Sequence, residues 1–160
     1  MVKRLSAAIC CAGTVLLGSS VAMARSEIRA IHSADGISIV GVASMYNPYR
    51  PGYREGGVET ASGERYDASA WAAAIQTDLR EKFGGVRRGS RPGYALVEGI
   101  NKKAIVKIND VGPLKPGRII DFGEKIMRYF DPTLRLGLLH NIRVTPLSGD
   151  DWVPGPIAER

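Results

Sequence analysis

Short apolar segments separated by turn residues recur along the chain, and this pattern predicts a mainly β protein. Residues 37–46 begin with alternating apolar and polar positions, and residues 142–147 alternate cleanly, as is typical of half-buried strands. Residues 94–98 and 104–108 are two more apolar segments joined by a short connection, which predicts a hairpin. Two further short strands are predicted, one within residues 69–75 after a helical turn and one at residues 119–120.

One helix is predicted near the C-terminal end, at residues 123–130. Its apolar residues Ile126, Met127 and Phe130 are spaced as on the inner face of a helix, and Asp131-Pro132 ends the element. About six short strands in one open sheet would leave edge strands exposed, whereas closure into a barrel removes those edges. We therefore predict a small, six-stranded β-barrel with one short helix.

The remaining segments complete the predicted domain organisation. Residues 37–148 form the predicted barrel domain, preceded by a loose N-terminal arm at residues 25–36 and followed by a polar tail at residues 149–160. The charged residues 78–91, interrupted by two glycines, are predicted to form a surface loop. The 19 glycines and nine prolines agree with many turns, and 44% hydrophobic residues are enough for a core.

The first 24 residues have the pattern of a secretory signal peptide. Lys3 and Arg4 are followed by apolar and small residues, and Ala22-Met23-Ala24 matches an A-x-A cleavage site. The alternative is an uncleaved membrane anchor, because roughly 20 apolar residues are enough to span a bilayer. The pattern favours export to the periplasm or cell envelope with cleavage near Ala24.

Both cysteines, Cys10 and Cys11, lie within this segment, and the apolar run before them is too short for a lipoprotein signal. A mature chain without cysteine has no disulfide and no thiolate nucleophile. His32 and His140 are the only histidines, so neither a metal site nor a cofactor is expected.

The net charge indicates the class of partner. The chain has 22 basic and 16 acidic residues, a net charge of +6, and removal of Lys3 and Arg4 would leave +4. Positive charge favours residence near an anionic polymer. Because the chain has no nucleic-acid-binding motif, nucleic acid is a poor candidate, and an anionic cell-wall glycan or a membrane surface fits better.

The most promising place for chemistry is residues 105–121. A β-branched run ends at Asn109-Asp110, turn residues follow, and a second short run ends at Asp121, with Arg118 before it. Ends of strands and the loops after them are where scaffolds commonly hold reactive groups. Glu64 and Asp67 are three residues apart, which would place them on one face of a helical turn.

Four sequence blocks resemble the successive motifs of the rare lipoprotein A (RlpA) family. They are Gly-Val-Ala-Ser-Met-Tyr at residues 41–46, Thr-Ala-Ser-Gly-Glu-Arg-Tyr-Asp at 60–67, Val-Lys-Ile-Asn-Asp-Val-Gly-Pro at 106–113 and Gly-Arg-Ile-Ile-Asp at 117–121. The resemblance spans residues 41–147 and implies a six-stranded double-psi β-barrel, a fold distantly similar to expansins and barwins.

This resemblance implies a lytic transglycosylase that acts on peptidoglycan. Such enzymes break the bond between N-acetylmuramic acid and N-acetylglucosamine without water, and the 6-hydroxyl of the muramic acid closes a 1,6-anhydro ring. The family prefers strands stripped of stem peptides and works at the division septum. It therefore implies glycan strands as the partner of a monomer, with divisome or other envelope proteins as further partners.

The resemblance also implies roles for individual residues. Asp110 would be the acid and base, with a pKa raised by partial burial or by the neighbouring charge of Glu64. The alternative for Asp110 is an Asx-turn before Gly112-Pro113, and Asp121 would serve equally as a buried acceptor or as a partner of Arg118. The residues implied to shape the substrate groove are Tyr46, Thr60, Ser62, Tyr66, Asp67, Arg118 and Asp121.

The sequence departs from the family pattern at three positions. Ile75 stands where active members carry a histidine, Met45 where tryptophan is common, and Val111 where arginine is common. The segment formed by residues 80–92 is also longer than is usual in the family. These departures keep two alternatives open, a non-catalytic module that binds or loosens the wall and an exported inhibitor or partner protein that uses the barrel as a scaffold.

Overall fold

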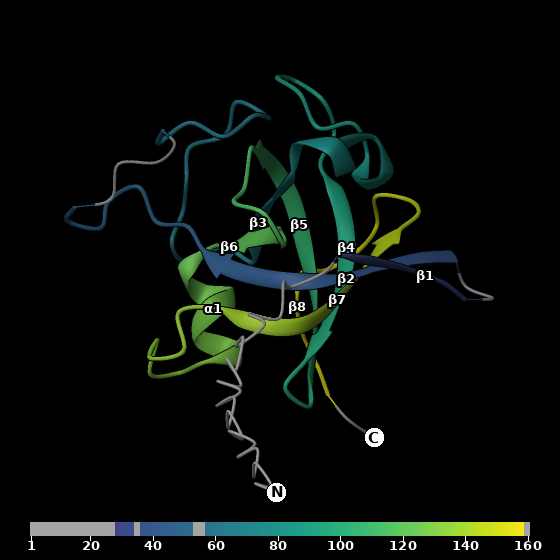
Figure 1. Cartoon of the computed structure of the whole chain (residues 1–160). Helices are drawn as coiled ribbons and strands as arrows, with labels where there is room; N and C mark the ends of the chain where they lie inside the picture. The colour runs from purple at the N-terminus through teal and green to yellow at the C-terminus, as the bar shows by residue number, and fades with distance from the viewer. Residues whose placement is uncertain (1–27, 34–35, 53–56, 159–160) are drawn as a thin grey trace, which may run out of the picture.

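The computed structural model describes residues 28–33, 36–52 and 57–158, and these form one mainly β domain (Figure 1). The proposed signal peptide at residues 1–24 lies outside the described residues. The elements in chain order are β1 (Arg29–Ser33), β2 (Gly36–Met45), β3 (Ala72–Gln76), η1 (Thr77–Phe83), β4 (Gly93–Gly99), β5 (Lys102–Gly112), β6 (Arg118–Phe122), α1 (Glu124–Phe130), β7 (Leu139–Leu147) and β8 (Gly155–Ile157).

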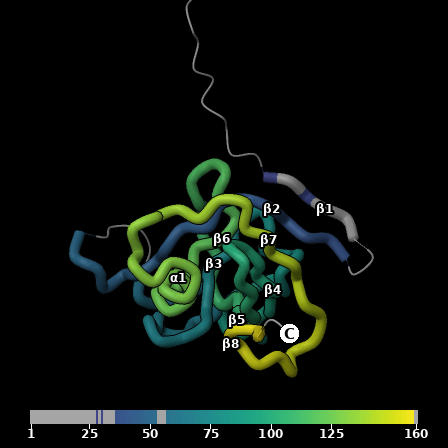
Figure 2. Tube along the Cα trace, turned by 90° about the horizontal axis from the view of Figure 1, so that it is seen from below, coloured from purple at the N-terminus to yellow at the C-terminus, as the bar shows by residue number. Residues whose placement is uncertain are grey.

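Six strands close into a barrel in the order β2, β6, β3, β5, β4, β7, and β7 pairs back with β2 (Figures 1 and 2). The pairs β2–β6 and β3–β5 are parallel, and the other four barrel pairs are antiparallel. This confirms the predicted mainly β, six-stranded barrel and is consistent with a double-psi β-barrel. Helix α1 is where the sequence predicts it, and η1 is a second short helix that it does not predict.

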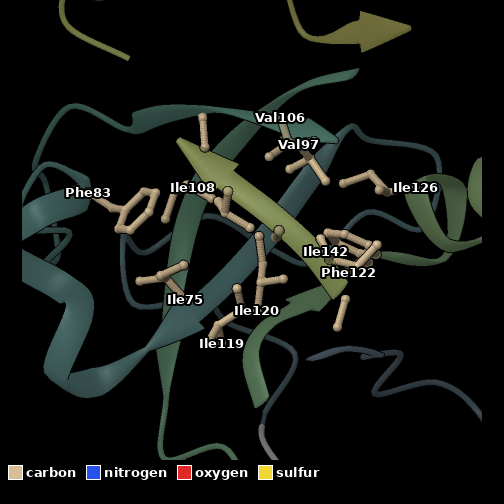
Figure 3. Packing of buried hydrophobic residues seen from close by; sticks show 14 of the residues in the cluster. Ile75, Phe83, Val97, Val106, Ile108, Ile119, Ile120, Phe122, Ile126 and Ile142 are labelled. Atoms are coloured by element: carbon tan, nitrogen blue, oxygen red, sulfur yellow. The ribbon is translucent and has the colours of Figure 1, made fainter. Parts of the chain in front are cut away.

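The barrel interior is filled by β-branched and aromatic side chains from every barrel strand (Figure 3). Helix α1 covers one end, because Ile126, Met127 and Phe130 are all buried against the core, as their spacing predicts. Phe130 stacks on Phe122 of β6 with ring centroids 5.6 Å apart. The strands that form this apolar core also carry the polar side chains of the candidate site.

Two segments predicted to be irregular are strands instead. Residues 29–33 of the predicted loose arm form β1, which pairs with Gly36–Val40, and residues 155–157 of the predicted tail form β8 against Lys103–Ile105. Both add to long barrel strands, β2 and β5, that extend past their barrel partners. An exposed strand edge offers unpaired backbone groups, and these added strands satisfy them.

The predicted surface loop at residues 78–91 begins with the 3-10 helix η1. Leu79 and Phe83 of η1 are buried, and Gly84 ends the element in the left-handed conformation with φ of 92°. The spacing of four residues between Leu79 and Phe83 is a helical signal that the high charge of this segment concealed.

The predicted hairpin is confirmed: all of β4 pairs with residues Lys102–Ile108 of β5, and Ile100 and Asn101 join the two strands. Both turn residues have positive φ values, 51° and 56°. This is the conformation that two-residue hairpin turns require, and it suits asparagine but strains a β-branched residue such as isoleucine.

Replacing Ile100 with asparagine should therefore stabilise the domain by about 1 kcal/mol, because the strained side chain is already 47% exposed and contributes little packing. Urea unfolding of the domain measures this difference. The control is Ile37→Asn, since Ile37 is 39% exposed but lies in β2 without positive φ. An Ile100→Asn variant that unfolds at lower urea concentration than the parent would contradict the prediction.

Among the residues that the structure describes, no helix is both long and apolar enough to cross a membrane.

Candidate active site

Two cavities adjoin on one face of the barrel and share four lining residues, Tyr46, Thr60, Ala74 and Asp110. The smaller has a volume of about 210 Å³ and the larger about 470 Å³. We call the two together the groove. Asp110 lies where they meet, so a chain-like ligand lying along the groove would pass directly over its carboxyl group.

The position of Asp110 in the groove depends on an irregularity in β5. In the parallel pair β3–β5, Ala73 faces Ile108 and Ala74 faces Asp110, so Asn109 is an extra residue at this point. A bulge of this kind re-aims side chains in the strand that carries it. As a result, Asn109 and Asp110, although adjacent in sequence, both line the smaller cavity.

Asp110 and Asp121, predicted at strand ends, lie inside their strands, because β5 continues to Gly112 and β6 to Phe122. The two aspartates lie on the same face of the sheet. Ala74 of β3 is the register partner of Asp110 on β5 and of Asp121 on β6. All three residues line the larger cavity. Neighbouring strands are about 4.8 Å apart, so the two aspartate backbones lie roughly 10 Å apart across the groove floor.

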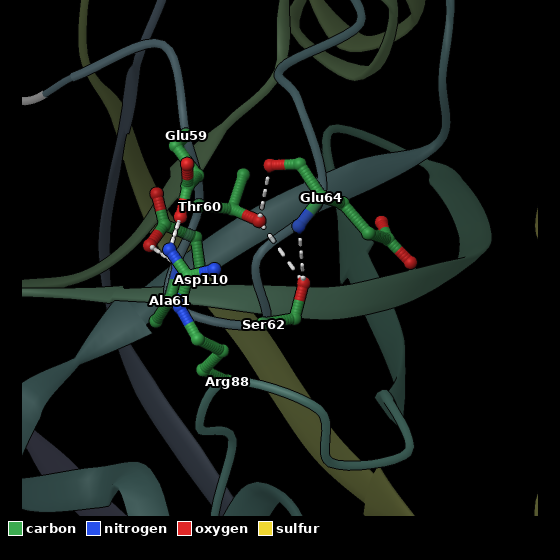
Figure 4. A network of polar contacts seen from close by, with 7 residues as sticks. All are labelled: Glu59, Thr60, Ala61, Ser62, Glu64, Arg88 and Asp110. Carbon is green, nitrogen blue, oxygen red and sulfur yellow. Dashed lines mark hydrogen bonds and ion pairs between the residues drawn. The ribbon is translucent and has the colours of Figure 1, made fainter.

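The carboxyl group of Asp110 is anchored through one oxygen. Its Oδ1 accepts a hydrogen bond from the backbone N–H of Ala61 at 2.8 Å (Figure 4) and another from the backbone N–H of Val111, also at 2.8 Å. No described residue donates to Oδ2, which leaves that oxygen for a ligand. The bond to Ala61 also ties the loop of residues 60–64 to β5.

Burial raises the pKa of Asp110 above its ordinary value, against the lowering effect of the two backbone hydrogen bonds. This agrees with the expectation of a raised pKa by partial burial, and it does not come from the charge of Glu64. A carboxyl group that holds its proton to higher pH is better suited to act as a general acid.

Glu64 has the opposite electrostatic setting. Its Oε2 accepts hydrogen bonds from Lys107 Nζ at 2.6 Å and Asn109 Nδ2 at 2.7 Å. Burial alone would raise the pKa of Glu64, but these two hydrogen bonds and the charge of Lys107 lower it. Glu64 is therefore an ionised group at neutral pH, and it fixes Lys107 and Asn109 at the edge of the smaller cavity.

The expected helical turn at Glu64 and Asp67 is absent, because Arg65 forms an isolated bridge with Glu59 and the segment around it is extended or turned. Both carboxylates nevertheless line the smaller cavity. Asp67 Oδ1 accepts hydrogen bonds from the backbone and hydroxyl groups of Ser69, which lower its pKa. Its carboxylate is thus an ionised acceptor at the cavity rim.

Tyr46 and Tyr66 line the smaller cavity, but their rings are mostly buried. They pack edge to face with centroids 5.0 Å apart, and the Tyr66 hydroxyl donates to the Tyr46 carbonyl at 2.9 Å. The Tyr46 hydroxyl in turn donates to the Gly57 carbonyl. The two rings therefore hold the groove wall in place more than they offer an open stacking surface.

The other predicted groove residues divide between wall and support. Thr60 lines both cavities and shares a hydrogen bond of 3.0 Å with Ser62, which lines neither cavity. Arg118 and Asp121 line the larger cavity, and Asp121 Oδ1 accepts a hydrogen bond from the buried Ser44 hydroxyl. Ser62 thus supports the groove loop, whereas Thr60 contacts the groove itself.

The structure adds two groove lysines that the sequence analysis did not single out, Lys107 and Lys115. Lys107 is two positions before the bulge residue Asn109 and pairs with Glu64. The sequence did carry a signal for Lys107. In the alternating run Val106-Lys107-Ile108-Asn109, residues two apart share a face of the strand, so Lys107 and Asn109 are expected on the same polar face. Among the described residues, no cluster of histidine, cysteine and acidic side chains is suited to hold a metal ion.

Ile75, which stands where the family resemblance expects a histidine, is fully buried. Its register partners are Val111 on β5 and Ile120 on β6, and it belongs to the apolar core. Ala74, one residue earlier, faces the groove instead. His140 of β7 lines neither cavity, so it does not take the place of a groove histidine.

The comparisons with known proteins agree with this geometry. Two curated relatives, both named endolytic peptidoglycan transglycosylase RlpA, are from Yersinia pestis (33% identical over 95 residues) and Rickettsia felis (32% identical over 98 residues). The aligned regions are 58% and 59% of this chain but only 22% and 36% of those relatives. The chain thus corresponds to a minor part of the length of these relatives.

A solved structure, the Streptomyces papain inhibitor, has the same fold at 17% identity, with a TM-score of 0.52 over 69% of this chain and 94% of that one. The family model described as lytic transglycolase matches residues 38–140, a range that contains every described residue lining the groove. On this evidence the chain belongs to the lytic transglycolase family, with a double-psi β-barrel fold.

Proposed function

We propose that this protein cleaves the glycan strands of peptidoglycan as a lytic transglycosylase, with Asp110 as the acid and base. The observation that carries the proposal is a half-buried carboxyl group of raised pKa at the junction of two cavities in one groove. The family match and the names of the two relatives support the same activity. The amino-terminal sequence supports an exported chain that meets this polymer in the cell envelope.

The proposed reaction needs only one such group. Asp110 donates its proton to the glycosidic oxygen that leaves with N-acetylglucosamine, and the bond from that oxygen to C1 of N-acetylmuramic acid breaks. The 6-hydroxyl oxygen of the muramic acid bonds to C1, and its proton passes to the Asp110 carboxylate. The enzyme is restored, and no water is consumed, unlike in glycoside hydrolases that use two carboxylates.

The bonding of Asp110 fits this cycle. Oδ1 is held by the N–H groups of Ala61 and Val111, so the proton is expected on Oδ2. The two backbone donors also stabilise the carboxylate formed after the first proton transfer. Glu64 and Asp67 remain ionised in the smaller cavity and are suited to accept hydrogen bonds from sugar hydroxyl or N–H groups.

A second function, glycan binding without cleavage, is favoured by the core position of Ile75 and by the lack of a histidine among the described residues that line the two cavities. Mass spectrometry of soluble products from purified, peptide-free glycan strands separates the two. Anhydro-muramyl products would support the transglycosylase, whereas binding to sacculi without soluble products would replace it with the binding module. Products with reducing ends would indicate a hydrolase that uses a second carboxylate.

A further inference from the structure

A third cavity, which we call the side cavity, opens beside the groove. Its volume is about 290 Å³, and it lies between β2, α1 and the loop before β7. Arg118, the first residue of β6, lines both the larger groove cavity and the side cavity. The two spaces are therefore neighbours that share Arg118.

Arg118 is half-buried, and no described residue forms a hydrogen bond or ion pair with its guanidinium. Other arginines of the domain are paired: Arg88 with Glu59, Arg91 with Asp150 and Arg128 with Glu124. Partial burial of a cation without a partner is unfavourable, and an anionic ligand would relieve it. The planar guanidinium also binds a carboxylate through two parallel hydrogen bonds.

The side cavity combines positive charge with apolar walls. Arg50 contributes a second cation, and Met45, Met127, Leu134 and Leu138 contribute apolar surface. None of the described residues that line this cavity is acidic. Its chemistry therefore fits a small group that bears both a carboxylate and a methyl or similar apolar part.

The substrate of the proposed reaction has such a group as a branch. N-acetylmuramic acid differs from N-acetylglucosamine by an ether-linked lactyl group, which consists of a methyl-bearing carbon and a carboxyl group. In a strand that lacks stem peptides this carboxylate is free, whereas a stem peptide converts it to a neutral amide. A branch from a linear chain needs space beside the groove, which is where the side cavity lies.

We propose that Arg118 is a specificity-determining residue that binds the free lactyl carboxylate of N-acetylmuramic acid, with the branch directed into the side cavity. This inference rests on the proposed function and deepens it. It accounts for selection of peptide-free strands by charge pairing at one guanidinium, and it makes Met45 and Leu138 the contacts for the lactyl methyl group.

The test is isothermal titration of the full chain carrying Asp110→Asn, which prevents consumption of the ligand. Three oligosaccharides of equal length are compared: a peptide-free peptidoglycan fragment, the same fragment with its lactyl carboxylates converted to carboxamides, and a chitin oligomer without lactyl groups. We expect the free-carboxylate fragment to bind about tenfold more tightly than the other two, as a charge-assisted hydrogen bond would give.

Arg118→Gln should remove this preference by weakening only the free-carboxylate fragment about tenfold, and Arg118→Lys should retain part of it. The matched control is Arg143→Gln, because Arg143 is also half-buried and lines none of the three cavities. It should leave all three affinities unchanged.

Two results would overturn the inference alone: an Arg118→Gln variant that keeps the preference, or one that weakens all three ligands equally. The product assay on the unsubstituted chain stands apart from these results. If that chain neither binds nor cleaves any of the strands, the proposed function fails, and this inference fails with it.

Discussion

The Asp110→Asn variant should release anhydro-muramyl products about a hundred- to ten-thousandfold more slowly than the parent chain, as expected for loss of a general acid. Asparagine retains an oxygen that accepts the hydrogen bonds from Ala61 and Val111, so the loop and the bulge should stay in place. Product release from peptide-free strands, followed by mass spectrometry, measures the rate. Asp150→Asn, a change at an exposed ion pair, should leave the rate unchanged.

The Asp110→Asn variant should also change how the stability of the domain depends on pH. Because burial raises the pKa of Asp110 in the folded protein, the folded state binds this proton more tightly than the unfolded state. Stability therefore falls as pH rises from the ordinary value of 3.8 through the raised value. Asp110→Asn removes this dependence, so the stability of the variant relative to the parent chain should be greater at pH 7 than at low pH.

In the activity measurement, equal turnover in parent and variant would exclude Asp110 as the acid.

The Ile75→His variant should be destabilised by about 3–5 kcal/mol and should show no gain in activity. Ile75 is fully buried between Val111 and Ile120, so the change removes apolar packing and places polar ring nitrogens in the core. Its neighbour Ala74, not residue 75, is the register partner of Asp110 and lines the groove. Urea unfolding and the product assay together measure both effects.

Ile75→Val is the matched control, because it removes one methylene group and should cost only about 1 kcal/mol. If Ile75→His instead folded stably and released products faster, the barrel strand would have to shift so that residue 75 enters the groove. That outcome would restore the family histidine as part of the mechanism and would reduce the role assigned to Asp110 alone.

Most of the barrel could be predicted from the sequence because its strands carry local signals. The alternation in residues 142–147, the paired apolar runs of the β4–β5 hairpin and the spacing in α1 each depend on nearby residues only. The strands β1 and β8 could not be predicted in this way. They form because the long strands β2 and β5 leave edges unpaired, and that is a property of the assembled sheet.

The candidate site shows the same division. The apolar run before Asp110 marked this segment as a place for chemistry, and the family resemblance implied the acid role and the raised pKa, whose direction agrees with the burial of Asp110. The bulge at Asn109, which aims two consecutive residues at one cavity, depends on register with β3 and has no signal within β5 itself. Likewise, the spacing of Glu64 and Asp67 indicated a helical turn, while the contacts with Lys107 and Ser69 decided their actual positions.

The pairings of β2 with β6 and β7 also determine when the domain can become complete during folding. Ala43 of β2 pairs with Ile120 of β6, 77 positions later, and Ile39 pairs with Val144 of β7, even farther along the chain. Closing such long loops costs chain entropy before any contact compensates for it, so the folding rate should be low for a domain of this size. A nascent chain in which β7 has not yet been synthesised cannot close the barrel. The unpaired edge of β2 is then the surface most exposed to association with other chains.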